Sequence, residues 1–134
     1  MNTSALSDTV KASATWQTTG IVKGVKIRGT IPQVGHAAYH GINGDSYGYI
    51  IVEVAPDGTW FTYARAEGAA PSGKAWLCTR KNSRLAGCYV MSDYCYLGVT
   101  PDTKPEMNYR YARYSTIYAS SKLGCGETEL DPSF

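Results

Sequence analysis

One segment near the middle of the chain constrains the fold more than any other. Residues 49–54 are a β-branched run, residues 56–58 read Pro-Asp-Gly, and residues 59–66 are rich in aromatic side chains. Two such runs joined by a Pro-Asp-Gly turn are typical of a β-hairpin. We therefore predict a mostly β protein, with α+β as the alternative, in which a single antiparallel-sheet domain is built around a central hairpin at 49–66.

Weaker patterns on both sides of this hairpin predict further strands. Apolar and basic residues alternate over 22–28, which indicates a half-buried strand. Short strands are also expected at 74–79 and within 88–99, with a basic turn at 80–87 between them. Residues 32–48 contain one proline and four glycines and are expected to form a long loop.

The pattern changes towards the end of the chain. Met107, Tyr111, Tyr114 and Tyr118 are spaced by four, three and four residues, which is one face of a helix. A helix near 104–122 is therefore expected. The alternative is a strand, because Tyr, Thr and Ile are good strand formers.

Length and charge limit the classes of protein to consider. The chain has 134 residues, close to the size of one domain. We expect one domain over 1–134, with a polar N-terminal arm at 1–20 and a flexible acidic tail at 126–134. The net charge of +2 gives no argument for nucleic acid as a partner. No apolar run approaches the roughly 18 residues of a membrane-spanning helix.

Four cysteines lie in the second half of the chain, at Cys78, Cys88, Cys95 and Cys125. An even number of cysteines in a small, strand-patterned chain predicts disulfide bonds. Of the three possible pairings we expect Cys78–Cys88, which closes the basic turn, and Cys95–Cys125. Free buried thiols and a metal site are the alternatives, although no closely spaced pair of zinc ligands is present.

The cysteines also predict a compartment. Disulfides persist in oxidising surroundings, so we expect an extracellular or cell-surface location. Residues 1–19 contain neither the basic start nor the apolar stretch of a signal peptide. The two observations agree if the chain is a mature or trimmed form with Met1 added. A cytosolic protein with free thiols is the alternative.

Catalytic motifs are weak throughout the sequence. His36 and His40 lie four residues apart with Asp45 nearby, so a small hydrolase that uses these histidines is one hypothesis. No glycine-rich phosphate loop, nucleophile elbow or zinc-protease motif accompanies them. We therefore expect no enzyme activity, no catalytic residue, no cofactor and no metal.

Aromatic and cationic side chains supply the candidate binding surface. Tyrosine and tryptophan faces stack on sugar rings or on bases, and their polar atoms form hydrogen bonds at wet interfaces. The chain has 11 tyrosines but only two phenylalanines, which favours such half-exposed rings. The candidate binding residues are Trp60, Tyr63, Tyr111, Tyr114, Tyr118, Arg110 and Arg113.

One part of the chain resembles a known family. Residues 20–28 (GIVKGVKIR), the strands expected at 49–54 and 59–66, and KAWLCT at 74–79 resemble the sheet region of type IV pilin head domains, over about residues 20–95. The family's strand with a Trp-x-Cys motif matches Trp76 and Cys78. The resemblance implies that Cys78 bonds to a later cysteine, Cys88 or Cys125. The family's long N-terminal apolar helix is missing, and four cysteines replace its usual single disulfide.

The resemblance implies an extracellular subunit that assembles and adheres without catalysis. We therefore expect a structural or adhesive protein, pilin-like or part of another surface assembly, that contacts other protein subunits and self-assembles. A carbohydrate-binding, lectin-like module is the second hypothesis, with glycans as partners, and a virion structural protein is the third.

Overall fold

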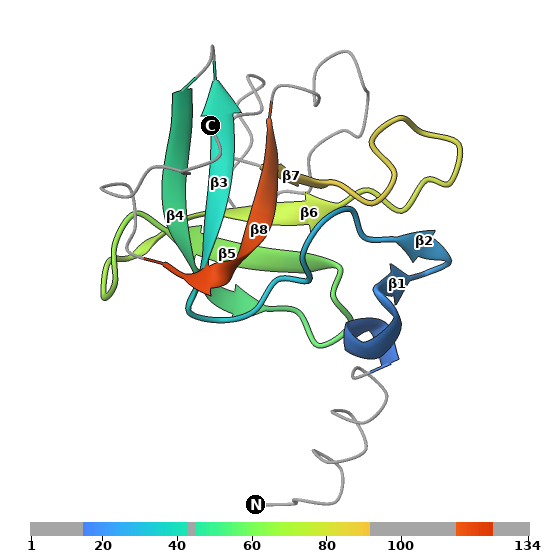
Figure 1. Ribbon diagram of the computed structural model, residues 1–134, viewed down its shortest axis with the longest axis horizontal. Helices are drawn as coiled ribbons and strands as arrows, with labels where there is room; N and C mark the ends of the chain where they lie inside the picture. The colour runs from blue at the N-terminus through green and yellow to red at the C-terminus, as the bar shows by residue number, and fades with distance from the viewer. Residues whose placement is uncertain (1–14, 43–44, 92–114, 125–134) are drawn as a thin grey trace, which may run out of the picture.

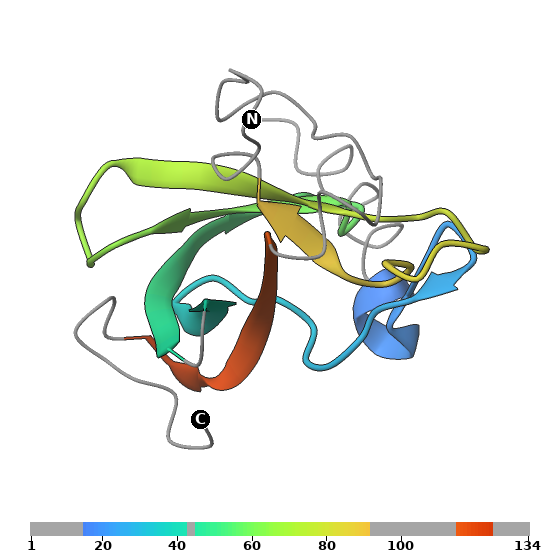
Figure 2. The same ribbon diagram turned by 90° about the horizontal axis from the view of Figure 1, so that it is seen from above.

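Six antiparallel strands close on themselves to form a barrel, seen in two views in Figures 1 and 2. The computed structural model describes residues 15–42, 45–91 and 115–124. Consecutive strands are neighbours, and the last pairs with the first, so each of the six has a partner on both sides. The barrel strands are β3 (His36–Ile42), β4 (Asp45–Val54), β5 (Trp60–Ala64), β6 (Pro71–Leu77), β7 (Tyr89–Met91) and β8 (Thr116–Leu123). The mostly β, antiparallel prediction is confirmed.

The central hairpin is also confirmed, as strands β4 and β5. Ile51 lies opposite Tyr63 in their antiparallel register. The turn is closed by a hydrogen bond from the Gly58 N–H to the Ala55 carbonyl oxygen, at 2.9 Å. Gly58 has a φ of 77°, a left-handed conformation that glycine adopts without steric cost. The Pro-Asp-Gly sequence therefore forms the turn that its residue types predict.

The strand expected at 22–28 is instead a small hairpin beside the barrel. β1 (Ile21–Val22) pairs with β2 (Val25–Lys26) in a separate two-stranded sheet. Lys23 and Gly24 form the turn with φ values of 48° and 79°, as a tight type I′ turn requires. The expected alternation still holds after the turn, because Val25 is buried and Lys26 is exposed.

The long loop expected at 32–48 is wrong, because most of it is strand. β3 begins at His36, and β4 begins at Asp45. Gly48 lies directly opposite Tyr39 in the β3–β4 register and is itself buried. A glycine inside a strand often marks a close approach of a neighbouring group.

The helix expected near 104–122 is wrong where it can be compared. Residues 116–122 belong to β8, whose Tyr118 pairs with Tyr39 of β3. The barrel supplies β8 with partners on both sides, so the strand preference of its Thr, Ile and Tyr residues prevails. Residues 104–114 lie outside the described residues.

The N-terminal arm expected at 1–20 is only partly described. Residues 15–19 form a short helix. Residues 1–14 and the predicted acidic tail at 126–134 lie outside the described part. Within 15–42, 45–91 and 115–124, no helix has the length and apolar character that crossing a membrane requires.

Aromatic rings fill the interior of the barrel. The centroids of Tyr49 and Tyr63 are 4.9 Å apart, and those of Phe61 and Tyr89 are also 4.9 Å apart, both pairs in edge-to-face geometry. Phe61 and Tyr63 link these pairs at 6.3 Å. Ala75 and other small residues on facing strands leave room for these rings. Side chains therefore fill the centre of the barrel.

The Pro56–Gly58 turn is held between the short helix and the barrel interior. The Trp16 indole N–H donates to the Pro56 carbonyl oxygen at 2.9 Å, and the Trp16 ring lies against the Gly58 Cα. From the interior, the Tyr89 hydroxyl donates to the Gly58 carbonyl oxygen at 2.7 Å. One turn thus anchors the helix at 15–19 to the barrel.

Candidate functional site

Two tryptophans and a lysine form an ordered group on the outer face of β5 and β6. Trp60 and Trp76 are directly opposite in the β5–β6 register, and their ring centroids are 6.4 Å apart. The Lys74 Nζ atom lies 4.2 Å from the centroid of Trp60 and 5.3 Å from that of Trp76. All three side chains are half-buried. We call this group, Trp60, Lys74 and Trp76, the tryptophan platform.

Strand alternation places the platform outside the barrel. Phe61 and Ala75 point into the core, so their neighbours Trp60, Lys74 and Trp76 point outwards. An exposed cation–π contact contributes about 0.5–1 kcal/mol, and a tilted aromatic pair adds about 0.5–1.5 kcal/mol. These interactions hold the three side chains in a defined arrangement before any ligand binds.

Packing against other apolar side chains also holds Trp76 in place. It packs against a second apolar cluster, formed by Cys78, Leu85 and Val90, on the outside of the barrel. Its indole N–H is buried and has no hydrogen-bond acceptor among the described residues. Leaving a buried donor unpaired costs about 1–3 kcal/mol, so Trp76 occupies this place in spite of a local penalty.

A basic surface lies beside the platform. It is formed by the β1–β2 hairpin with the residues that follow it, and by the turn at 80–87, which lie side by side in both views (Figures 1 and 2). Leu85 belongs to the turn and to the cluster under Trp76, so the turn that carries part of the basic surface packs next to the platform. We define the basic surface as the exposed cations Lys23, Lys26, Arg28, Arg80, Lys81 and Arg84.

Backbone contacts hold the two halves of the basic surface together. The Arg28 N–H donates to the Gly87 carbonyl oxygen at 3.0 Å, and the Arg28 Nη2 atom donates to the Arg84 carbonyl oxygen at 2.9 Å. The Lys81 side chain lies so close to Gly24 that a Cβ there would stand 2.7 Å from its Cε. These contacts therefore bring the cations of the two segments together on one surface.

Asp57 lies at the edge of the basic surface. Partial burial raises the pKa of its carboxyl group, but hydrogen bonds from the Thr59 side chain and N–H, together with the Lys23 ammonium, outweigh this. The net pKa of Asp57 is below its ordinary value of 3.8. Its Oδ1 atom accepts from the Thr59 hydroxyl at 2.6 Å. Asp57 thus stabilises the β4–β5 turn as a carboxylate.

The predicted disulfide between Cys78 and Cys88 is wrong, because both residues are free thiols in the structure. They face each other where the β6–β7 ladder continues, with the Cys78 N–H donating to the Cys88 carbonyl oxygen at 2.9 Å. Their side chains have separate partners, since Cys78 packs with Leu85 and Cys88 is hydrogen-bonded to the Arg28 side chain. Cys95 and Cys125 lie outside the described residues.

The Cys88 thiol is not activated. Its partial burial raises the pKa by more than the Arg28 guanidinium lowers it, and the nearby Cys78 raises it further. The net pKa of Cys88 is therefore above its ordinary value, which keeps the thiol protonated at neutral pH.

The two histidines are separated along one strand and do not meet. Both lie on β3, and four residues of strand separate them by roughly 13 Å. His36 Nδ1 lies 3.2 Å from the Ser120 carbonyl oxygen, and His40 Nδ1 lies 2.9 Å from that of Thr116. Each imidazole is therefore engaged with β8. Across the described ranges, no cluster of three or more His, Cys, Asp or Glu side chains is placed to hold a metal ion.

The sequence-predicted binding residues are divided by the fold. Trp60 lies on the platform, whereas Tyr63 is fully buried inside the barrel and does not reach the surface. Tyr118 is 42% exposed, but it lies on β8, three strands away from β5 around the barrel. The other four candidates, Tyr111, Tyr114, Arg110 and Arg113, fall outside the described residues.

Sequence reasoning missed Lys74 and Trp76 as partners of Trp60. A signal was present, because residues 60 and 76 are equally distant from the glycine of the 65–70 loop, so a hairpin centred there places them opposite each other. Both also fall on the outward positions of their strands.

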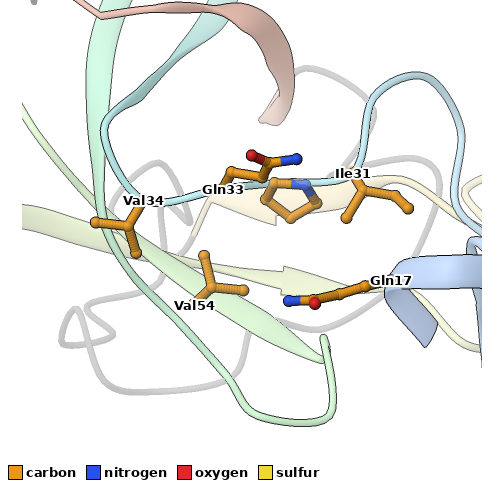
Figure 3. Close-up of a pocket in the computed structure, with 6 residues that line it drawn as sticks. Gln17, Ile31, Gln33, Val34 and Val54 are labelled. Atoms are coloured by element: carbon orange, nitrogen blue, oxygen red, sulfur yellow. The ribbon is translucent and has the colours of Figure 1, made fainter. Parts of the chain in front are cut away.

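Two cavities lie away from the platform. The first, of about 530 Å³, lies between the short helix and the stretch after Thr30, where Gln17 faces Gln33 across the opening and Val54 closes one side (Figure 3). The second, of about 430 Å³, is mainly apolar and includes Val34 and Leu123 in its lining. Among its described lining residues, the first cavity has no titratable side chain and the second has only Glu67.

Comparison of the chain with protein-family models, with curated proteins and with solved structures found no match. The resemblance to type IV pilin head domains stays a prediction. Trp76 and Cys78, which carry it, lie on β6 and directly after it.

Proposed function

We propose that the protein is a non-catalytic, lectin-like module that binds a glycan on the tryptophan platform. The observation that carries this proposal is the ordered pair of half-buried indoles, Trp60 and Trp76, on an outer barrel face. Apolar C–H faces of sugars pack on such rings, and their hydroxyl groups bind nearby donors such as the Lys74 ammonium. An adhesive role at a cell or particle surface is consistent with this chemistry.

The rigidity of the platform supports binding. Trp76 is fixed by the cluster beneath it, and Lys74 is held between the two rings. Little side-chain entropy therefore remains to be lost when a ligand binds, and such preorganisation increases affinity.

A glycan array probed with the full chain, followed by titration calorimetry on the strongest hit, tests the proposal. Trp60→Leu keeps an apolar side chain but removes the ring face, so we expect it to abolish binding while the far-UV circular dichroism spectrum stays unchanged. Tyr47→Phe removes only the hydroxyl group from another exposed ring, on β4, and this variant should bind the glycan as the wild type does. Absence of any hit, or full binding by Trp60→Leu, would refute the proposal.

Self-assembly through other surfaces is a second candidate function. Val34 and Leu123 are 62% and 74% exposed beside the mainly apolar cavity, and exposed apolar patches often mark protein contacts. The expected partner is a second copy of the chain. Light scattering after size exclusion should show oligomers that Leu123→Ser converts to monomers; a monomeric wild type at high concentration would remove this candidate.

A further inference from the structure

We propose that the ligand of the tryptophan platform is an acidic polysaccharide, whose carboxylate or sulfate groups bind Lys74 and the basic surface. This inference rests on the glycan-binding function proposed above and names the chemical class of its ligand.

Lys74 places a positive charge within the sugar site itself. Its Nζ atom is 4.2 Å from the Trp60 centroid, so a sugar packed against the platform lies within reach of the ammonium. A carboxylate or sulfate on that sugar forms a charge-assisted hydrogen bond, about twice as strong as the bond that a neutral hydroxyl forms. The platform therefore favours a charged sugar over a neutral one.

The basic surface extends this preference beyond one sugar. Trp76 packs on Leu85, and the turn that carries Leu85 also carries Arg80, Lys81 and Arg84. The same turn is hydrogen-bonded to the residues that follow the β1–β2 hairpin. A chain with an anionic group on successive sugars can thus contact the platform and run along exposed cations, which steer it electrostatically.

The shape of this region favours a polysaccharide over single-stranded nucleic acid. Proteins that bind single strands without sequence preference combine a basic groove with stacking rings. Here the cations lie on the β1–β2 hairpin, on the residues that follow it and on the turn at 80–87, and neither of the two cavities has a described Lys or Arg in its lining.

The test measures binding of the full chain to four probes: polygalacturonate, heparin, neutral dextran and an oligothymidylate of about 20 nucleotides. Titrations at about 0.01 M and about 0.1 M salt separate charge from stacking, because the Debye length falls from about 30 Å to about 10 Å. We expect the acidic polysaccharides to bind more tightly than dextran and to weaken at the higher salt.

Matched variants assign the effect to residues. Lys74→Met keeps a long apolar side chain over the indoles and removes the charge, so affinity for polygalacturonate should fall roughly tenfold. Arg80→Gln should weaken binding more than Arg65→Gln, which removes the same charge from the loop at the opposite end of β5. If Lys74→Met does not fold, the comparison of the two arginines carries the test.

Each outcome separates the two proposals. Dextran bound as tightly as polygalacturonate refutes the acidic ligand and leaves glycan binding intact. No binding to any of the three polysaccharides also refutes the acidic ligand, and a glycan array without a hit then refutes glycan binding as well. Oligothymidylate bound more tightly than either acidic polysaccharide, with dependence on Trp60, replaces the inference with nucleic-acid binding. Equal effects of Arg80→Gln and Arg65→Gln also overturn it.

Discussion

Replacing Gly58 with alanine tests whether the β4–β5 turn depends on close packing against the short helix. A Cβ at this position would lie 2.6–2.9 Å from three atoms of the Trp16 ring system, closer than carbon atoms approach. The residue also has a φ of 77°, which an L-residue adopts only at a cost. Two separate penalties therefore act at one site.

The two penalties can be given magnitudes. A left-handed conformation costs a non-glycine residue about 1–2 kcal/mol. Forcing an extra methyl group into a filled space costs about 1–3 kcal/mol more. Gly58→Ala should therefore lower the free energy of unfolding by roughly 2–5 kcal/mol. Gly68→Ala is the matched control, because its φ is 80° and nothing lies within 4 Å of its Cβ position.

Urea denaturation followed by far-UV circular dichroism, with reductant present, measures both variants. Gly58→Ala should lose about 1–3 kcal/mol more than Gly68→Ala. In a Trp16→Ala background this excess should disappear, since the ring that causes the clash is gone. The reasoning is refuted if the two variants differ by less than about 0.5 kcal/mol, or if the excess persists without the ring.

Four further predictions concern the titratable groups. Tyr89→Phe leaves the Gly58 carbonyl oxygen without its donor and should lower the free energy of unfolding by about 1–2 kcal/mol. Burial raises the pKa of Tyr89, so this side chain ionises first in the unfolded chain, and the wild type should lose stability above about pH 10. Tyr89→Phe should lose less stability over the same range. Equal slopes of unfolding free energy against pH for the two proteins would contradict this. Asp57 has a lowered pKa, so its stabilising effect should be lost as pH falls below about 4, and Asp57→Ala should show a smaller acid loss in the same titration. Iodoacetamide should alkylate Cys88 only slowly below about pH 9 and should leave Cys78 unmodified until the chain unfolds, as measured by peptide mapping. A Cys78–Cys88 disulfide recovered from unreduced protein would contradict the structure.

The parts of the fold that were predictable are those specified by neighbouring residues. The 49–66 hairpin carries its strand pattern and its turn residues within one short segment. The β3 strand was missed because Gly41 and Gly48 resemble loop residues until the barrel gives them strand partners. β8 was confused with a helix because its Tyr118 continues a helical spacing from residues outside the strand. The pairing of β8 with β3, about 80 residues away, cannot be predicted from the residues of β8 alone.

In the candidate site, too, only the features that depend on neighbouring residues were predictable. Trp60 was predicted as a surface aromatic because it lies in the hairpin, but the inward position of Tyr63 depends on which face of the sheet closes around the core. A one-residue change of register exchanges the two faces, and β5 and β6 contain an irregularity between Tyr63 and Ala64. The grouping of Trp60 with Lys74 and Trp76 thus requires the register.

The pairing of β3 with β8 has a consequence for biosynthesis. Hydrogen bonds at this seam join side chains and carbonyl groups 76 and 84 residues apart, so the seam forms only after β8 has left the ribosome. Until then the nascent sheet presents two unpaired borders, on β3 and β7, to other growing chains. A product truncated before residue 116 should therefore precipitate or require a chaperone, even though it retains most of the aromatic interior.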